Sequence, residues 1–365
     1  MAKDSLWILL LLVIVAVSRL DLVESDPLQA IYIFGDSTMD VGTNNHLKDS
    51  LARSDMPFNG IDFPFSQPTG RFSNGHNTAD LIVRLFGENR SPSPFLTLLS
   101  HQSTFKADIM KGVNFASGGS GILKETGNYT LKEVVPLEVQ IDQFSTVCSN
   151  ITQLLGSDKG NSLINSSLYI ISVGSNDFFD YQRLNLSASI PRDALLASLH
   201  QTYARQLKRL YCLGARKFGI VSVPPIGCCP FERAVYGGGE CVDDMNAFAL
   251  DFYELTRSML ENLSRKFPDF EYSLGNAYNM TMTMLNNPIL FGIREAKTAC
   301  CGQGKFNGEV PCNKSASLCP DRKEYLFWDM FHPTQAVSQL AALTLYGGSQ
   351  PFVAPMNFSR LAGVV

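Results

Sequence analysis

Residues 31–38 read Ile31-Tyr32-Ile33-Phe34-Gly35-Asp36-Ser37-Thr38, an apolar run that stops at a Gly-Asp-Ser turn. A short apolar run that ends at turn residues is typical of a buried β-strand. In open parallel sheets, active sites lie at the carboxyl ends of the strands. Ser37 is therefore a candidate nucleophile, although a serine after a strand is more often a helix cap.

Five runs of this kind alternate along the chain with patterns of apolar residues at helical spacing. Strands that alternate with helices imply right-handed βαβ units, and hence a parallel sheet covered by helices on both faces. The sequence therefore predicts an α/β fold, a three-layer αβα sandwich. The expected strands are 30–34, 112–116, 168–173, 217–223 and 270–273, and the clearest expected helices are 194–213, 244–266 and 334–345.

Two further strand ends carry turns that could supply hydrogen-bond donors beside a serine nucleophile. Residues 117–121 read Ser-Gly-Gly-Ser-Gly, and Gly174-Ser175-Asn176-Asp177 follows the third strand. Attack on an ester requires donors for the oxyanion that forms, and the candidates are the backbone N–H groups of Ser37 and Gly118 and the side-chain amide of Asn176. A simple tight turn is the alternative for 117–121, since its spacing is not the G-x-G-x-x-G of a pyrophosphate site.

A base for Ser37 is found near the other end of the chain, in Asp329-Met330-Phe331-His332-Pro333. A serine hydroxyl becomes a nucleophile only when a base accepts its proton, and His332 is the best candidate. Asp329 can accept from the second ring nitrogen of His332 and fix its tautomer. The alternative is a helix-capping Asp329 and a surface His332. Met39 replaces the second glycine of the Gly-x-Ser-x-Gly elbow, which excludes that motif.

The N-terminal residues predict secretion. Lys3 precedes an unbroken apolar run at 7–17, which suits a signal peptide and is shorter than the roughly 20 residues of a membrane-spanning helix. We expect residues 1–25 to be a cleaved signal peptide; an uncleaved anchor is the alternative. Eight Asn-x-Ser/Thr sequons also indicate passage through a glycosylating compartment. They begin at Asn128, Asn150, Asn165, Asn185, Asn262, Asn279, Asn313 and Asn357.

The nine cysteines predict disulfides in an oxidising compartment. Four of them lie in residues 292–323, which we expect to form a disulfide-stapled insertion bridged internally; a zinc site is disfavoured, because the spacing lacks paired C-x-x-C motifs. We also expect Cys228 to pair with Cys241. An odd number leaves at least one thiol free, and we expect this to be Cys212, packed in an apolar environment at the end of its helix.

Composition narrows the class of protein. With 45% hydrophobic residues the chain can bury a large core, and its formal net charge of −4 offers nothing that would attract nucleic acid. No second long apolar run follows the first, so we expect no stable membrane span. Residues 47–77, rich in Gly, Pro and Phe, predict a long surface loop near the site. The sequence leaves the oligomeric state open.

Four ordered blocks carry a resemblance to a known family. The Gly35-Asp36-Ser37 turn, the run 112–119, the Gly174–Asp177 turn and the Asp329–Pro333 segment resemble those of the plant GDSL esterase/lipase family, within the SGNH hydrolases. The match covers nearly all of residues 26–365. It implies one hydrolase domain with a flavodoxin-like parallel sheet, a catalytic triad of Ser37, Asp329 and His332, and an oxyanion hole of Ser37, Gly118 and Asn176. Thr38 departs from the family name, which has leucine there.

The resemblance implies a secreted, extracellular serine esterase or lipase, in the cell wall or apoplast. Its substrates would be carboxylic esters of lipids or acylated cell-wall polymers, and neither a cofactor nor a metal is expected. Two alternatives stay open. The same triad can transfer the acyl group to an alcohol, or the protein can be a non-catalytic, wall-associated binding protein.

Overall fold

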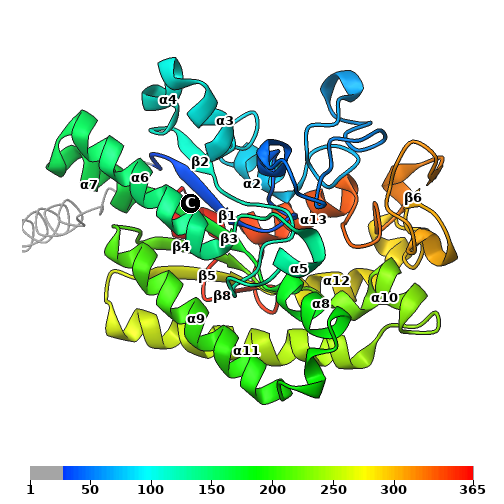
Figure 1. Cartoon of the computed structure of the whole chain (residues 1–365). Coiled ribbons are helices and arrows are strands. Elements are labelled where there is room, and N and C mark those ends of the chain that lie inside the picture. Colours follow the sequence, from blue (N-terminus) through cyan, green and yellow to red (C-terminus); the bar gives the residue numbers. More distant parts are fainter. Residues whose placement is uncertain (1–27, 365) are drawn as a thin grey trace, which may run out of the picture.

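The computed structural model describes residues 28–364, and its centre is a six-stranded sheet in the order β2-β1-β3-β4-β5-β8 (Figure 1). Neighbouring strands are parallel, except that the short β8 runs antiparallel to β5. The order 2-1-3-4-5 is that of flavodoxin-like sheets. The strands are β1 (Ile31–Gly35), β2 (Gly112–Asn114), β3 (Leu168–Ser172), β4 (Lys217–Val221), β5 (Glu271–Gly275) and β8 (Val353–Ala354).

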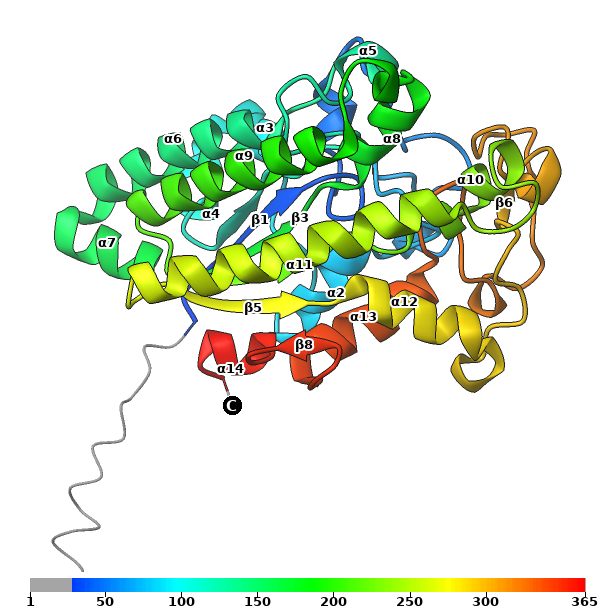
Figure 2. The same cartoon turned by 90° about the horizontal axis from the view of Figure 1, so that it is seen from below.

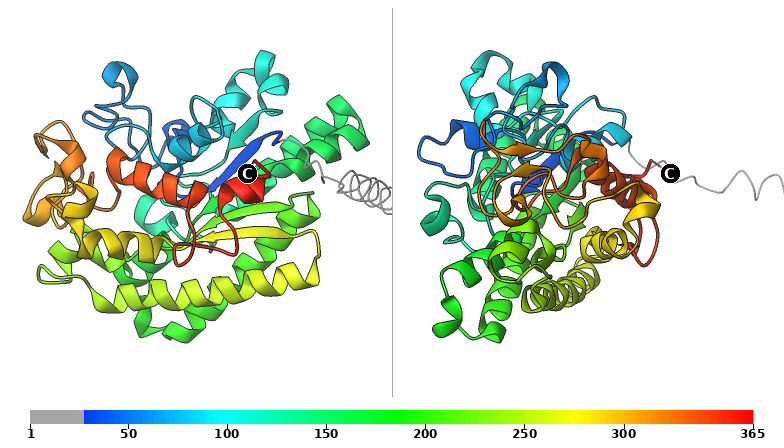
Figure 3. Two further views of the ribbon diagram at one scale, coloured as in Figure 1. Left: turned by 180° about the vertical axis from the view of Figure 1, so that it is seen from behind. Right: turned by 90° about the vertical axis from the view of Figure 1, so that its right-hand side faces the viewer.

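Alternation along β1 explains the three layers. Tyr32 and Phe34 pack into one hydrophobic cluster, whereas Ile31 and Ile33 pack into a second cluster on the other face. Successive side chains of a strand point to opposite faces, so both faces of this strand are apolar and both must be covered by helices. Figure 2 shows α6, α9 and α11 over one face, and the left panel of Figure 3 shows α13 and α14 across the other.

The helices that cover the first face are α6 (Leu137–Leu155), α9 (Arg192–Cys212) and α11 (Asp243–Lys266). Those that cover the second are α2 (Thr78–Leu85), α13 (Gln335–Gly347) and α14 (Phe358–Ala362). The remaining α-helices are α3 (Phe95–Ser100), α4 (Gln102–Asp108), α5 (Asn128–Leu131), α7 (Ser157–Ser166), α8 (Ser175–Arg183), α10 (Pro230–Val235) and α12 (Ala277–Asn286). Short 3₁₀ turns lie at η1 (Thr43–His46), η2 (Pro64–Ser66), η3 (Leu186–Ala188), η4 (Ile226–Cys228), η5 (Pro288–Phe291), η6 (Lys305–Asn307) and η7 (Arg322–Glu324).

The predicted sandwich is confirmed, and each expected strand and helix is present with its ends shifted by at most a few residues. The edge strand β8 was not predicted. The expected signal peptide lies outside the described residues. Within residues 28–364, no helix combines the length and the apolar character that crossing a membrane requires.

The disulfides follow the expected pairing. Cys228 pairs with Cys241, and the later cluster is bridged internally by Cys300–Cys319 and Cys301–Cys312. The two-residue strands β6 (Cys301–Gly302) and β7 (Ser317–Leu318) pair beside these bridges, at the end of the molecule toward which the parallel strands point (Figure 1). The four bridged cysteines surround the buried Trp328, which directly precedes Asp329.

The free thiols differ from expectation. Cys148, Cys212 and Cys229 are all unpaired in the described part of the chain. The free Cys212 agrees with the prediction, but its expected apolar environment is wrong: Cys212 is exposed, whereas Cys148 and Cys229 are buried. The reason is its place as the last residue of α9, where the helix turns it away from the core that holds Leu210.

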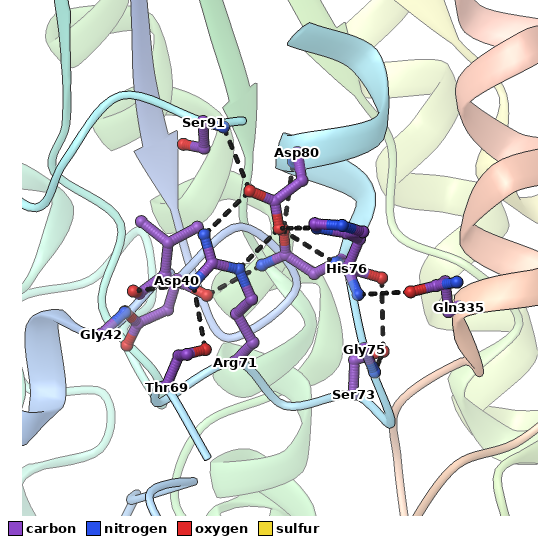
Figure 4. A network of polar contacts seen from close by, with 12 residues as sticks. Asp40, Gly42, Thr69, Arg71, Ser73, Gly75, His76, Asp80, Ser91 and Gln335 are labelled. Atoms are coloured by element: carbon purple, nitrogen blue, oxygen red, sulfur yellow. Dashed lines mark hydrogen bonds and ion pairs between the residues drawn. The ribbon is translucent and has the colours of Figure 1, made fainter. Parts of the chain in front are cut away.

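Residues 47–77 are irregular, as predicted, but buried polar contacts fix them to the fold. Figure 4 shows Arg71 and His76 converging on Asp80 at the start of α2. Arg71 donates to both oxygens of the Asp80 carboxylate, at 2.5 and 2.8 Å, and the two side chains are 7% and 0% exposed. The guanidinium holds the pKa of Asp80 far below its usual range even though burial opposes ionisation.

The same segment also fixes the start of α13. The N–H of Gln335 donates to Asn74 Oδ1. Gln335 Oε1 accepts the N–H of His76, as Figure 4 shows. Nearby, Trp328 Nε1 donates to Asn59 Oδ1 at 2.9 Å. Since Trp328 and Gln335 flank Asp329 and His332, this N-terminal loop positions the C-terminal residues of the site.

Candidate active site

The end of β1 presents Ser37 in a turn that only glycine permits. Gly35 has φ +137°, and a Cβ there would lie 2.0 Å from the carbonyl oxygen of Ser172 on the adjacent β3. The next residue, Asp36, donates its N–H to this same oxygen at 3.0 Å, and its carboxylate accepts the N–H and hydroxyl of Thr38. The chain therefore turns sharply after the sheet and leaves Ser37 half-buried at its edge.

Ser37, His332 and Asp329 form one chain of hydrogen bonds. His332 Nε2 lies 2.7 Å from Ser37 Oγ, and His332 Nδ1 lies 2.8 and 2.9 Å from the two carboxylate oxygens of Asp329. Asp329 Oδ1 also accepts the backbone N–H groups of Phe331 and His332, each at 2.9 Å. These contacts fix the carboxylate, orient the imidazole, and leave Nε2 free to accept the serine proton.

The three expected oxyanion donors differ in whether their N–H groups already have an acceptor within the protein. Asn176 stands in the first turn of α8 and donates one amide hydrogen to Ser120 O at 2.9 Å, which leaves its second hydrogen unassigned. The N–H of Gly118, however, already donates to Asp40 Oδ2 at 2.9 Å. Gly119, and not Gly118, lines the cavity at Ser37. Among residues 28–364, the N–H groups of Ser37 and Gly119 have no protein acceptor.

Two buried carboxyl groups hold the loops that carry the candidate oxyanion donors. Asp40 accepts from the N–H groups of Gly118, Gly42 and Thr43, and Asp177 accepts from Ile122, Leu123 and Thr126. Burial raises the pKa of each carboxyl to about 6, against the opposing effect of these donors. Burial likewise raises the pKa of Asp36, which directly precedes the candidate nucleophile Ser37.

The sequence did not predict Asp40 or Gln140 as parts of the site. Gln140, on α6, accepts the N–H of Gly35 and donates to Gly35 O and Val135 O, so it ties the end of β1 to the covering helix. A glutamine in an amphipathic helix gives no sign in the sequence that it is buried. Asp40, four residues after Asp36, could have been suspected from its place beside the nucleophile.

A cavity of about 370 Å³ opens beside Ser37. Its lining is mostly apolar and comes from the 47–77 loop, the turns after the strands, and helices α8, α12 and α13. Of the loop phenylalanines, Phe72 lines the cavity and lies 4.9 Å from the His332 ring, whereas Phe58 packs beside the disulfide cluster and Phe65 is 92% exposed. Within the described residues, no group of three His, Cys, Asp or Glu side chains could hold a metal ion.

The sequon asparagines vary in exposure. Asn128, Asn165, Asn185 and Asn262 are exposed, and Asn150, Asn279, Asn313 and Asn357 are half-buried. Asn357 is also the N-cap of α14, and its amide donates to Gly348 O. Glycosylation therefore stays a prediction, with the four exposed positions the most accessible.

Comparison with known proteins agrees with this geometry. The family model described as GDSL-like Lipase/Acylhydrolase matches residues 31–345. The GDSL esterase/lipase At4g28780 of Arabidopsis thaliana is 37% identical over 344 residues, with 93% of this chain and 92% of that protein covered. A second Arabidopsis thaliana protein, GDSL esterase/lipase At2g23540, is 36% identical over 345 residues, with 92% and 88% covered.

Among solved structures, the extracellular lipase from Streptomyces rimosus aligns with 87% of this chain and 98% of its own, with a TM-score of 0.31 and 15% identity. The family assignment rests on the sequence matches, which span the segment from the strand before Ser37 to α13. The chain therefore belongs to the GDSL-like lipase/acylhydrolase family and is a carboxylic ester hydrolase.

Proposed function

We propose that this protein is a secreted esterase that hydrolyses carboxylic esters of lipids or acylated cell-wall polymers through an acyl-enzyme on Ser37. The observation that carries the proposal is the unbroken hydrogen-bond chain from Ser37 Oγ through His332 to Asp329. A nucleophile, a base and a group that orients the base are what acyl transfer through serine requires.

In the first half-reaction, Ser37 Oγ attacks the ester carbonyl carbon while His332 Nε2 accepts the hydroxyl proton. The imidazolium that forms is stabilised by Asp329, whose carboxylate faces Nδ1. His332 then gives this proton to the departing alkoxide, and the alcohol leaves. In the second half-reaction, His332 takes a proton from water, the hydroxide attacks the acyl-enzyme, and Ser37 regains its proton as the acid is released.

The tetrahedral intermediates of both halves carry a negative oxygen. We assign its donors as the backbone N–H of Ser37, the backbone N–H of Gly119 and the second amide hydrogen of Asn176. The assignment moves from Gly118 to its neighbour because the Gly118 N–H is engaged by Asp40. Donors held in place before the reaction stabilise the charge as it develops, without having to reorient.

The cavity lining supports an apolar acyl or alcohol group. Two helices contribute apolar side chains to this lining: α12 supplies Met280 and Met284, and α13 supplies Leu345. Flexible thioethers accommodate groups of varied shape. The lining therefore favours esters with a hydrocarbon portion.

The test is covalent capture. A fluorophosphonate probe should modify wild-type protein at Ser37, located by peptide mass mapping, and Ser37→Ala protein with an unchanged circular dichroism spectrum should remain unlabelled. The rate of ester hydrolysis by wild-type protein should fall as the labelled fraction of Ser37 rises. A folded Ser37→Ala protein that keeps wild-type turnover would refute the mechanism, and product analysis with and without an added alcohol separates hydrolysis from acyl transfer.

A further inference from the structure

Arg183, the last residue of α8, lines the same cavity as Ser37 but takes no part in the mechanism above. Its guanidinium carbon lies 4.6 Å from the ring centroid of Phe231, 4.9 Å from that of Phe331 and 5.6 Å from that of Phe179. Aromatic faces attract a cation, but they offer no oxygen to accept its N–H groups. The three rings therefore hold the guanidinium without satisfying its donors.

The guanidinium also makes no direct ion pair with a carboxylate in the described part of the chain. Among residues 28–364, no ion pair contains Arg183, and its buried Nε has no hydrogen-bond acceptor. The nearby carboxyl is that of Glu232, which is fully buried and whose two oxygens accept no hydrogen bond of ordinary geometry from the described residues. Burial raises the pKa of Glu232 to about 7, against the opposing effects of the Arg183 charge and of Gln182. Below that pH this carboxyl is largely neutral, and above it Glu232 offsets part of the Arg183 charge from a distance, without a hydrogen bond to the guanidinium.

Helix geometry aligns Arg183 with the reaction centre. Asn176, Phe179 and Arg183 stand at positions i, i+3 and i+7 of α8, which places them on one face of the helix, and all three line the cavity. Seven residues advance about 10 Å along a helix axis. One wall of the cavity thus begins at the candidate oxyanion donor, continues over a phenylalanine ring and ends at an unpaired cation.

We propose that Arg183 binds an anionic group of the substrate, a carboxylate or a phosphate, roughly 10 Å from the ester carbonyl. A guanidinium fork matches the paired oxygens of either group, and such charge-assisted bonds are among the strongest that a protein makes. The preferred substrates would then be esters that carry a second, negatively charged group. This substrate class rests on the proposed esterase function.

Matched esters test the proposal. The p-nitrophenyl hemiesters of adipate, suberate and sebacate carry a distal carboxylate at increasing distance, and their distal methyl esters are neutral counterparts. We expect wild type to prefer the anionic member of at least one pair. Arg183→Met should lower kcat/KM for that anionic ester by about 10- to 100-fold and leave the neutral ester nearly unchanged. Arg183→Lys should retain part of the preference, which should shrink as NaCl is added.

The control variant is Arg192→Met. Arg192 also lies over a ring, that of Phe248 at 4.4 Å, but it does not line the cavity and pairs with Asp251 on the surface. The Arg192→Met substitution should leave kcat/KM unchanged for both the anionic and the neutral ester of each pair. Equal losses on both members in Arg183→Met would overturn the proposal, because they would mean that Arg183 only supports the phenylalanine rings. A wild type that prefers no anionic ester would overturn it as well.

Binding to an inactive protein separates this proposal from the esterase function. On Ser37→Ala protein, hexanoate or hexyl phosphate should bind more tightly than hexanol by calorimetry, and adding Arg183→Met should remove the difference. Whichever of the two anions binds more tightly identifies the group, carboxylate or phosphate, that Arg183 recognises. If wild type hydrolyses neutral esters but the anions bind no better than hexanol, the inference fails alone; if no ester is hydrolysed, the proposed function fails.

Discussion

Replacing Asn176 by alanine tests the oxyanion assignment most directly. The side chain makes one bond to Ser120 O, and we assign its other amide hydrogen to the reacting oxygen. Losing a side-chain oxyanion donor costs about 2.7–4 kcal/mol in the transition state, or about 10²–10³ in kcat. Losing the bond to Ser120 costs about 0.5–1.5 kcal/mol of folding stability. We therefore expect a folded, slightly less stable protein whose kcat falls by about 10²–10³ while its KM changes little.

The assay is steady-state hydrolysis of a p-nitrophenyl ester, with active enzyme counted by fluorophosphonate titration and stability measured by urea unfolding. The matched control is Ser175→Ala, which removes a cavity-lining hydroxyl one residue away and should leave kcat close to wild type. A donor that acts only on developing charge lowers kcat and kcat/KM together. A raised KM with unchanged kcat would show that Asn176 binds the ground state, and the assignment would be wrong.

Three further outcomes are expected. Burial raises the pKa of Asp177 from 3.8 to about 6, so its contribution to stability is full below about pH 4 and is lost as the pH rises through 6. The stability of wild type relative to Asp177→Asn should therefore fall by about 2.5 kcal/mol from pH 4 to 7 in urea titrations. Arg71→Met removes the guanidinium partner of the buried Asp80 carboxylate and should cost about 3–5 kcal/mol of stability in the same assay; a loss below 1 kcal/mol would contradict the ion pair's role. Iodoacetamide should modify Cys212 in the native protein, but Cys148 and Cys229 only after denaturation, as peptide mapping would show.

The layers of the fold could be predicted because they depend on local pattern. The apolar run 168–173 and the helical spacing of 194–213 each depend on neighbours along the chain, and β3 and α9 appear where these patterns indicate. The edge strand β8 could not be found this way. It has two residues and is defined only by its antiparallel contact with β5, which no pattern within the segment reveals.

Chemical logic could name Ser37, His332 and Asp329 as candidates for a triad, because few side chains can serve as nucleophile, base and orienting acid. It could not choose between Gly118 and Gly119, because adjacent glycines differ only in where their N–H groups point. That direction is set by Asp40, 78 positions away. For the same reason, the unpaired state of Arg183 became visible only once its neighbours in space were known.

The attachment of the Asp329–His332 segment to the 47–77 loop has a consequence for synthesis of the protein. Ser37 and His332 are 295 positions apart. A ribosome that adds about 5–20 residues per second makes Ser37 some 15–60 s before His332. The anchors at Asn59 and Asn74 likewise wait for Trp328 and Gln335. A growing chain therefore holds Ser37 without its hydrogen-bond partner for most of its synthesis, and a chain that ends before His332 lacks the hydrogen-bond chain of the candidate site.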